Sequence, residues 1–237
     1  MENSSRQDPD SIIHFEGERQ FQLLNIHYQN PEYFLHLISN KKITKLVKKV
    51  LNDKFILSNF NASRAKKSLN KNYRLHIDSR KPMSEFKNTF QIVANICIDD
   101  FTSKNGSTVV VPKSHLSGND PRNENIQKDK ILATEASKGS VVFTLGQTWH
   151  DIGNNISGDR RWSIIAYYSC WWCKPTYDFV NTCNNEIFSK LTSFEKELLG
   201  FTTKPPIDWR SRQKTVCNPD DLPPNYEDAR NWDGSKF

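Results

Sequence analysis

The stretch that decides the fold is residues 139–169, GSVVFTLGQTWHDIGNNISGDRRWSIIAYYS. Its two ends, residues 139–145 and 161–169, are rich in β-branched and aromatic residues and follow a period of two, which is typical of strands. A polar segment with Gly153 and Gly158 separates them, as expected for a loop. We therefore predict two strands joined by a loop that begins near His150.

The same alternating pattern covers most of the chain from Phe55 onward, interrupted by clusters of turn residues. It predicts strands at residues 55–60, 73–78, 89–98, 107–111, 139–145 and 161–169. Asn105-Gly106 supplies a tight turn between two of them. Several short strands joined by polar loops predict a mainly β fold, either a sandwich or a barrel-like roll.

Helices are predicted on both sides of this β region. Pro31 suits a first helical turn, and the apolar residues from Ile43 to Leu51 recur with helical spacing, with lysines on the other face. Thr192 and Glu195 have the spacing of a capping box, and Gly200 marks the helix end. We divide a single domain, residues 1–237, into a polar N-terminal segment (1–30), buttressing helices (31–53), a β core (54–170), and a C-terminal helix with an extended tail (171–237).

Composition excludes several classes of protein. The chain has 237 residues, 36% of them hydrophobic, which is enough for one sizeable core. No run approaches the roughly 18 apolar residues of a membrane-spanning helix, residues 1–10 are polar, and the five cysteines are sparse and odd in number. These features predict reduced thiols and a cytoplasmic location. Despite a net charge of +6, lysines and aromatic residues lie mostly in different regions, which argues against a nucleic-acid partner. Oligomeric state is left open.

The first chemically suggestive motif is His76-Ile77-Asp78. In a strand the period of two places His76 and Asp78 on one face, where they could bind a divalent metal or form an exposed polar face. His150, at a strand end, is the candidate third ligand. We expect a structural or supporting role for His115. His14-Phe15-Glu16 has the same spacing as the first motif, but we expect no strand around it and set it aside.

The second motif is Arg161-Trp162-Ser163. Alternation places Arg161 and Ser163 on one face, where a guanidinium fork and a hydroxyl could together receive a planar carboxylate. The alternative is that Arg161 pairs with an acidic neighbour on the sheet.

Taken together, these segments resemble the phytanoyl-CoA dioxygenase family of Fe(II)- and 2-oxoglutarate-dependent oxygenases. His76-Ile77-Asp78 matches the family's H-x-D motif, and residues 98–108, IDDFTSKNGST, resemble its L-D-D-x-T-x-x-N-G stretch. Residues 112–115, PKSH, resemble its P-G-S-H, and Arg161 follows His150 at the family's offset of 11. The resemblance covers about residues 43–201.

This resemblance implies a double-stranded β-helix, a cupin-like jelly-roll with flanking α-helices. It implies that His76, Asp78 and His150 form a facial triad for Fe(II), which leaves three positions open. Arg161, assisted by Ser163, would hold the far carboxylate of 2-oxoglutarate, and O2 would be the second cosubstrate. The implied reaction is hydroxylation of a C–H bond with release of succinate and CO2. The carboxylate of Asp78 favours hydroxylation over halogenation, in which a small residue replaces it.

The substrate implied is a small molecule or a carrier-linked metabolite: an acyl-CoA, an amino acid, an osmolyte or a natural product. Two other functions stay open, namely a non-catalytic jelly-roll that binds a ligand and a metal enzyme of this fold that does not use 2-oxoglutarate. Lys113 stands where the family has glycine, so the turn must differ or lysine must tolerate it. Arg80 could recognise an anionic substrate or simply lie on the surface. We interpret the Cys170/Cys173 pair as structural.

Overall fold

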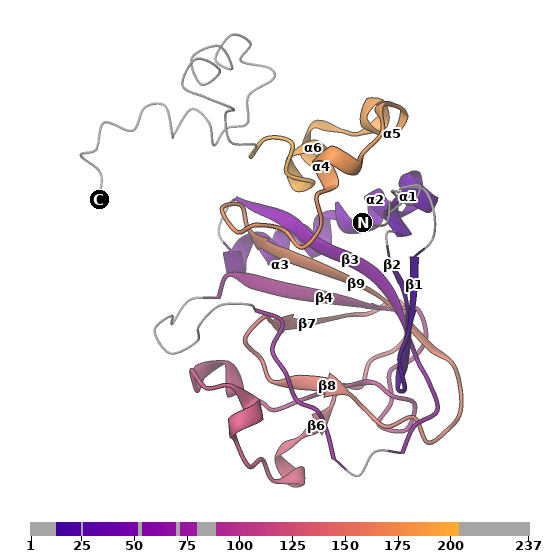
Figure 1. The fold of residues 1–237 in the computed structure, drawn as a ribbon, viewed down its shortest axis with the longest axis vertical. Coiled ribbons are helices and arrows are strands. Elements are labelled where there is room, and N and C mark those ends of the chain that lie inside the picture. The colour runs from indigo at the N-terminus through magenta and orange to yellow at the C-terminus, as the bar shows by residue number, and fades with distance from the viewer. Residues whose placement is uncertain (1–12, 25, 52–53, 70–71, 80–88, 204–237) are drawn as a thin grey trace, which may run out of the picture.

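The computed structural model describes residues 13–24, 26–51, 54–69, 72–79 and 89–203. Within these ranges the protein consists mainly of antiparallel strands in two facing sheets, with helices packed on one side (Figure 1). The large sheet has the strand order β1-β2-β3-β9-β4-β7, and the small sheet has the order β6-β5-β8. The predicted double-stranded β-helix with flanking helices is confirmed.

The large sheet is built around two long strands that pair with each other, β3 and β9. Its members are β1 (Ile13–Glu16), β2 (Gln20–Leu24), β3 (Phe55–Ala65), β4 (Gln91–Cys97), β7 (Val141–Leu145) and β9 (Arg161–Cys170). The small sheet consists of β5 (Thr108–Val110), β6 (Leu132–Ala133) and β8 (His150–Ile152). Five of the six predicted strand regions therefore contain a strand.

Helices occur where the sequence predicts them and at three further places, α1, α4 and α5. In the described part of the chain the α-helices are α1 (Ile26–Gln29), α2 (Pro31–Ile38), α3 (Lys41–Leu51), α4 (Phe179–Thr182), α5 (Asn185–Lys190) and α6 (Ser193–Leu198). Short 3-10 turns lie at η1 (Ser114–Leu116), η2 (Pro121–Asn123) and η3 (Lys128–Lys130). The capping box of Thr192 and Glu195 is formed, and Gly200 ends α6 with a φ of 88°. No helix in the described ranges is both long and apolar enough to cross a bilayer.

The main hydrophobic core lies between the helices and the outer face of the large sheet. Strand β9 shows how the period of two divides its residues: Ala166 and Tyr168 lie in this core, whereas Ile165 and Tyr167 line a cavity between the two sheets. The Tyr168 hydroxyl, buried in the core, donates to the carbonyl oxygen of Ile38 in α2 at 2.8 Å. The helices therefore bury one face of the sheet and leave the other free to carry polar groups.

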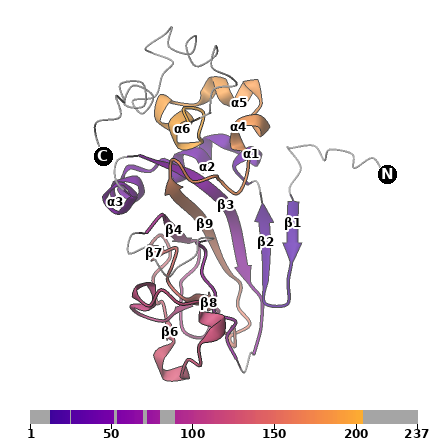
Figure 2. The same cartoon turned by 60° about the vertical axis from the view of Figure 1, so that its left-hand side comes forward.

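Two local expectations are wrong. Residues 73–78 form no strand, because this segment is linked to the rest of the sheet by an isolated bridge between His76 and His150. His14 lies in a strand after all: β1 pairs with β2, which extends the edge of the large sheet as a hairpin (Figure 2). The assignment of the whole chain to one domain stays a prediction, since the extended tail lies largely outside the described residues.

Two of the turns that use the left-handed backbone region belong to the predicted motifs. Gly106 has a φ of 81°, and a Cβ atom there would stand 2.7 Å from the Cβ of Ala65 in β3. Lys113 has a φ of 63°, so the lysine tolerates the conformation that glycine adopts more easily. The P-K-S-H turn therefore keeps a glycine-like backbone despite its side chain.

We expect Gly106→Ala to lower the free energy of unfolding more than Gly139→Ala. Both glycines have a φ of 81°, but a Cβ at Gly139 meets nothing within 4 Å. Backbone strain costs about 1–2 kcal/mol in either variant, and the contact with Ala65 should cost Gly106→Ala about 1–3 kcal/mol more. Urea unfolding of both variants measures the difference. Equal losses would contradict the close approach of Gly106 to β3.

Candidate metal centre

The structure brings His76, Asp78 and His150 together from two segments far apart in the sequence. His76 and His150 exchange backbone hydrogen bonds, with the His76 N–H donating at 2.9 Å and the His150 N–H at 3.0 Å. The Asp78 N–H donates to the carbonyl of Gly146 at 3.0 Å. These main-chain contacts hold the irregular segment of His76 and Asp78 against the start of β8 and the turn that precedes it.

The three side chains converge on one point. One ligand atom from each lies within 4.8 Å of the other two. The Nε2 atom of His150 is 3.3 Å from Asp78 Oδ2, and that of His76 is 4.0 Å from Asp78 Oδ1. The His76 side chain is 51% exposed, whereas Asp78 and His150 are mostly buried. Two imidazoles and a carboxylate in this arrangement can hold a divalent metal ion.

Both histidine rings are oriented by main-chain carbonyls. Nδ1 of His76 lies 3.3 Å from the oxygen of Arg74, and Nδ1 of His150 lies 2.9 Å from the oxygen of Thr148. When each Nδ1 carries the proton and donates it to its carbonyl, each Nε2 presents a lone pair to the common point. Metal-ligating histidines show this arrangement, so the residues present fit a metal.

The charges of the three groups are coupled. Burial by itself raises the pKa of Asp78, but His150 and His76 together outweigh it and hold that pKa below its usual value. Burial alone lowers the pKa of His150, whereas the Asp78 carboxylate raises it to a net value above normal. Burial and the neighbouring His150 lower the pKa of His76. Asp78 is therefore ionised at neutral pH, as a metal ligand must be.

The cluster opens into a cavity of about 470 Å³ between the two sheets. Many of its lining residues are polar and come from both sheets and the β1–β2 hairpin. They include Gln20, Gln22, Ser63, Asn95, Thr108, Thr144 and Tyr167. Arg161 lines the same cavity, so both predicted motifs face one space.

Arg161 is 3% exposed and is held by neutral groups. Its Nη1 donates to the Ser163 hydroxyl at 3.0 Å, Nη2 donates to the carbonyl of Gly106, and the guanidinium stacks on the Phe101 ring at 4.6 Å. Burial lowers the pKa of Arg161 to about 10, so the group stays charged at neutral pH. Among the described residues no carboxylate forms an ion pair with it, which removes the alternative of an acidic partner on the sheet.

Residues 98–107 form the loop that supplies the Gly106 carbonyl and leads into β5. Asp99 Oδ2 accepts from the Trp162 N–H at 2.7 Å, directly beside Arg161. Asn105 Nδ2 donates to the carbonyl of Asp100 at 2.7 Å, which closes the turn before Gly106. These contacts explain why aspartate and asparagine stand at these positions of the motif.

The remaining candidates lie elsewhere. The Ser114 hydroxyl accepts from the Trp149 N–H at 2.9 Å and so fixes the turn before His150. His115 lies in η1 and lines a second cavity of about 930 Å³, together with Cys170 and Trp171. Arg80 lies outside the described residues.

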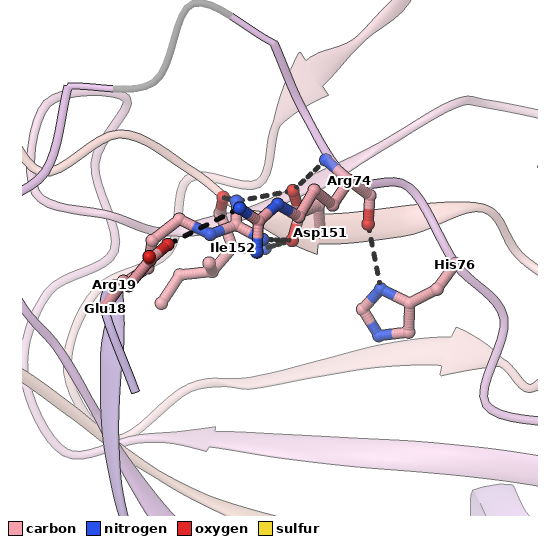
Figure 3. Close-up of polar contacts among 6 residues, drawn as sticks. All are labelled: Glu18, Arg19, Arg74, His76, Asp151 and Ile152. Atoms are coloured by element: carbon pink, nitrogen blue, oxygen red, sulfur yellow. Dashed lines mark hydrogen bonds and ion pairs between the residues drawn. The ribbon is translucent and has the colours of Figure 1, made fainter. Parts of the chain in front are cut away.

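Sequence reasoning missed an ion pair beside the cluster. Arg19, in the turn between β1 and β2, binds the buried Asp151 carboxylate with two hydrogen bonds of 2.6 and 2.7 Å (Figure 3). Asp151 directly follows His150, but its partner is 132 residues away, and no local pattern connects the two.

The family model described as phytanoyl-CoA dioxygenase (PhyH) matches residues 2–163. The chain belongs to the phytanoyl-CoA dioxygenase family. The match covers the His76 and Asp78 motif, His150 and the Arg161 motif, so the family resemblance inferred from these motifs is confirmed.

Two curated relatives are similar to this PhyH chain. Dioxygenase af480 of Aspergillus fumigatus is 26% identical over 172 residues, which cover 72% of this chain and 55% of that protein. The uncharacterized protein Rv1501 of Mycobacterium tuberculosis is 26% identical over 107 residues, covering 45% of this chain and 39% of that protein. The chain thus spans about half the length or less of the curated relatives it matches.

Solved structures share the fold. HygX from Streptomyces hygroscopicus, with nickel and 2-oxoglutarate bound, has a TM-score of 0.56 at 12% identity, over 76% of this chain and 83% of that one. The epimerase SnoN, in complex with Fe3+, alpha ketoglutarate and nogalamycin RO, has a TM-score of 0.53 at 16% identity, over 70% and 71%. Both likenesses establish the same overall fold.

We expect Asp78→Asn to move the pKa of His150 from above the usual histidine value of 6.5 to below it. Removing the carboxylate charge leaves burial as the dominant influence, and burial disfavours the imidazolium. NMR titration of the imidazole protons in the metal-free protein measures the shift. His27, whose pKa is lowered by burial to about 3, is an internal reference that stays neutral in both proteins. A His150 pKa that does not move would contradict the coupling.

Proposed function

We propose that this PhyH chain is an Fe(II)- and 2-oxoglutarate-dependent dioxygenase that hydroxylates a C–H bond of a small molecule. The observation that carries the proposal is that a buried guanidinium held by neutral groups faces the same cavity as a His–Asp–His cluster. The guanidinium can bind an anion, and the His–Asp–His cluster can bind a divalent cation. A dicarboxylate that also chelates the metal satisfies both.

In this proposal His76 Nε2, His150 Nε2 and an Asp78 oxygen would hold Fe(II), and the 2-oxo acid and O2 would bind at the positions left open. When bound, these cofactors supply the oxidation of the substrate C–H bond, with release of succinate and CO2. The protein's own part is positional. The Arg74 and Thr148 carbonyls hold the two rings in place.

Arg161 would bind the far carboxylate of 2-oxoglutarate, with the Ser163 hydroxyl supporting the guanidinium. Because Arg161 is almost fully buried, an ion pair there is weakened little by solvent. The affinity gained offsets part of the cost of keeping a cation inside the fold, which the Phe101 ring and the Gly106 carbonyl also reduce.

The substrate we propose is a small polar molecule. Amide, hydroxyl and charged side chains make up most of the cavity lining, and they form hydrogen bonds with polar groups. Two proteins of the same fold, SnoN and HygX, are described with nogalamycin RO and hygromycin B respectively. Because SnoN is described as an epimerase, the oxidative outcome must be measured. The cytoplasmic location stays a prediction from the sequence.

The test is anaerobic titration of the protein with Fe(II) and 2-oxoglutarate, followed by O2. We expect a weak visible charge-transfer band and then release of succinate. His76→Ala should abolish both, because one of the three metal ligands is lost. Arg161→Gln should keep metal binding and weaken 2-oxoglutarate binding about 10- to 100-fold, the effect of losing a charge-assisted hydrogen bond.

The matched control is Arg160→Gln, which removes the same charge from an exposed neighbour of Arg161 and should leave both bindings unchanged. Metal binding with no response to 2-oxoglutarate would favour an enzyme of this fold that does not use this cosubstrate. A folded protein that binds neither would favour a non-catalytic ligand-binding jelly-roll.

A further inference from the structure

The buried carboxylate of Asp151 is the meeting point of three segments around the cluster. Its side chain is 2% exposed and receives both terminal nitrogens of Arg19, whose side chain is 14% exposed. Oδ2 also accepts from the backbone N–H of Arg74 at 2.7 Å, and Oδ1 accepts from the N–H of Ile152 at 2.8 Å. One carboxylate thus joins the turn of the β1–β2 hairpin, the segment that carries His76, and strand β8.

This carboxylate reaches both histidines of the cluster through the main chain. The Arg74 N–H donates to the Asp151 carboxylate, and the Arg74 carbonyl oxygen accepts from the His76 ring. Arg74 therefore connects Asp151 to the His76 ring. Figure 3 shows this line of contacts, from Arg19 through Asp151 and Arg74 to the His76 imidazole. His150 directly precedes Asp151 in β8.

We propose that Arg19 and Asp151 are positioning residues of the metal centre. Their ion pair fixes where the Arg74 carbonyl lies, and hence the orientation of the His76 ring, and it fixes the start of β8, which carries His150. The inference rests on the proposed function, since it concerns the same metal site.

The physical argument is that this pair restricts geometry more than it adds stability. Removing two charges from water costs nearly as much as their attraction returns, so a buried pair contributes little net free energy of folding. A bidentate arginine–carboxylate contact, however, fixes both distance and plane. His76 depends on such help because it is the most exposed member of the cluster.

The same contact forms one wall of the cavity. Gly17, Glu18 and Arg19, in the hairpin turn, line the cavity, and Arg19 joins this turn to β8 of the opposite sheet. The pair therefore connects the two sheets at the side where the cluster lies. Another ion pair of the same hairpin, between Lys66 and Glu16 at 2.9 Å, is partly exposed and does not line the cavity.

The test measures metal affinity in the full chain with Co(II), whose visible spectrum reports ligand geometry, and with Fe(II) under anaerobic conditions. We expect Asp151→Asn and Arg19→Gln each to weaken metal binding about 10- to 100-fold, the range for residues that orient metal ligands. Each should also change the Co(II) spectrum. The double variant should lose little more than either single variant, because both changes break one contact.

Lys66→Met is the matched control, because it removes an ion pair of the hairpin that lies away from the cavity, and it should leave affinity and spectrum unchanged. Arg19→Lys, a milder change that keeps the charge but loses the fork, should fall between wild type and Arg19→Gln. If Asp151→Asn does not fold, the Arg19→Lys variant tests the inference in its place. If Arg19 only stabilised the fold, its substitution would lower the melting temperature without changing the Co(II) spectrum. A partial return of the spectrum in Arg19→Lys is therefore not expected from a role in stability alone.

Folded Arg19 variants that bind Co(II) and Fe(II) like the wild type, with the same Co(II) spectrum, would overturn the inference and leave the proposed function intact. A folded wild-type protein that binds neither metal would overturn both. The two failures are therefore told apart by the wild-type titration alone.

Discussion

The burial of the Arg161 charge is the constraint on which the inner side of the sheet depends. A guanidinium at this depth needs acceptors, and the chain supplies the Ser163 hydroxyl from the same face of β9 and the Gly106 carbonyl from a distant loop. That loop needs a glycine with positive φ pressed against β3, and it is fixed in turn by Asp99 and Asn105. The motif around residues 98–108 is thus largely the support of one cation.

The large sheet can carry polar groups on the face toward the cavity because apolar burial on its other face, beneath the helices, stabilises the fold. Strand β9 sends Ala166 and Tyr168 into the apolar core beneath the helices, and the alternate residues Ile165 and Tyr167 toward the cavity. Burial of apolar side chains contributes most of the folding free energy. The helices that buttress the sheet are therefore what permits a buried cation and a cluster of titratable groups on its other side.

The sequence predicts those features of the fold and the site that depend on local periodicity or on motifs shared with the family. Alternation places Arg161 beside Ser163, and the structure joins them by a hydrogen bond. Alternation also predicts a strand at residues 73–78, and this is wrong, because a strand needs a continuous neighbour and this segment has a single bridge, at His76. Strand β1 was missed because its partner is visible only once β2 is paired with β3. The contact of Arg19 with Asp151 spans 132 residues, so no local pattern contains it.

The Arg161 end and the metal-cluster end of the cavity have different backbone support. This difference explains why the additional polar contacts of Asp151 occur at the cluster end. Arg161 and Ser163 stand on a strand that is hydrogen-bonded on both sides, by β3 and β4 at Ser163, so regular sheet geometry places them. His76 and Asp78 stand on an irregular segment joined to its neighbours by a few main-chain bonds. Such a backbone has more freedom than a central strand. A metal centre tolerates little of that freedom, and the buried Asp151 carboxylate, with Arg19 and the Arg74 main chain, provides at this end the rigidity that the sheet provides at the other.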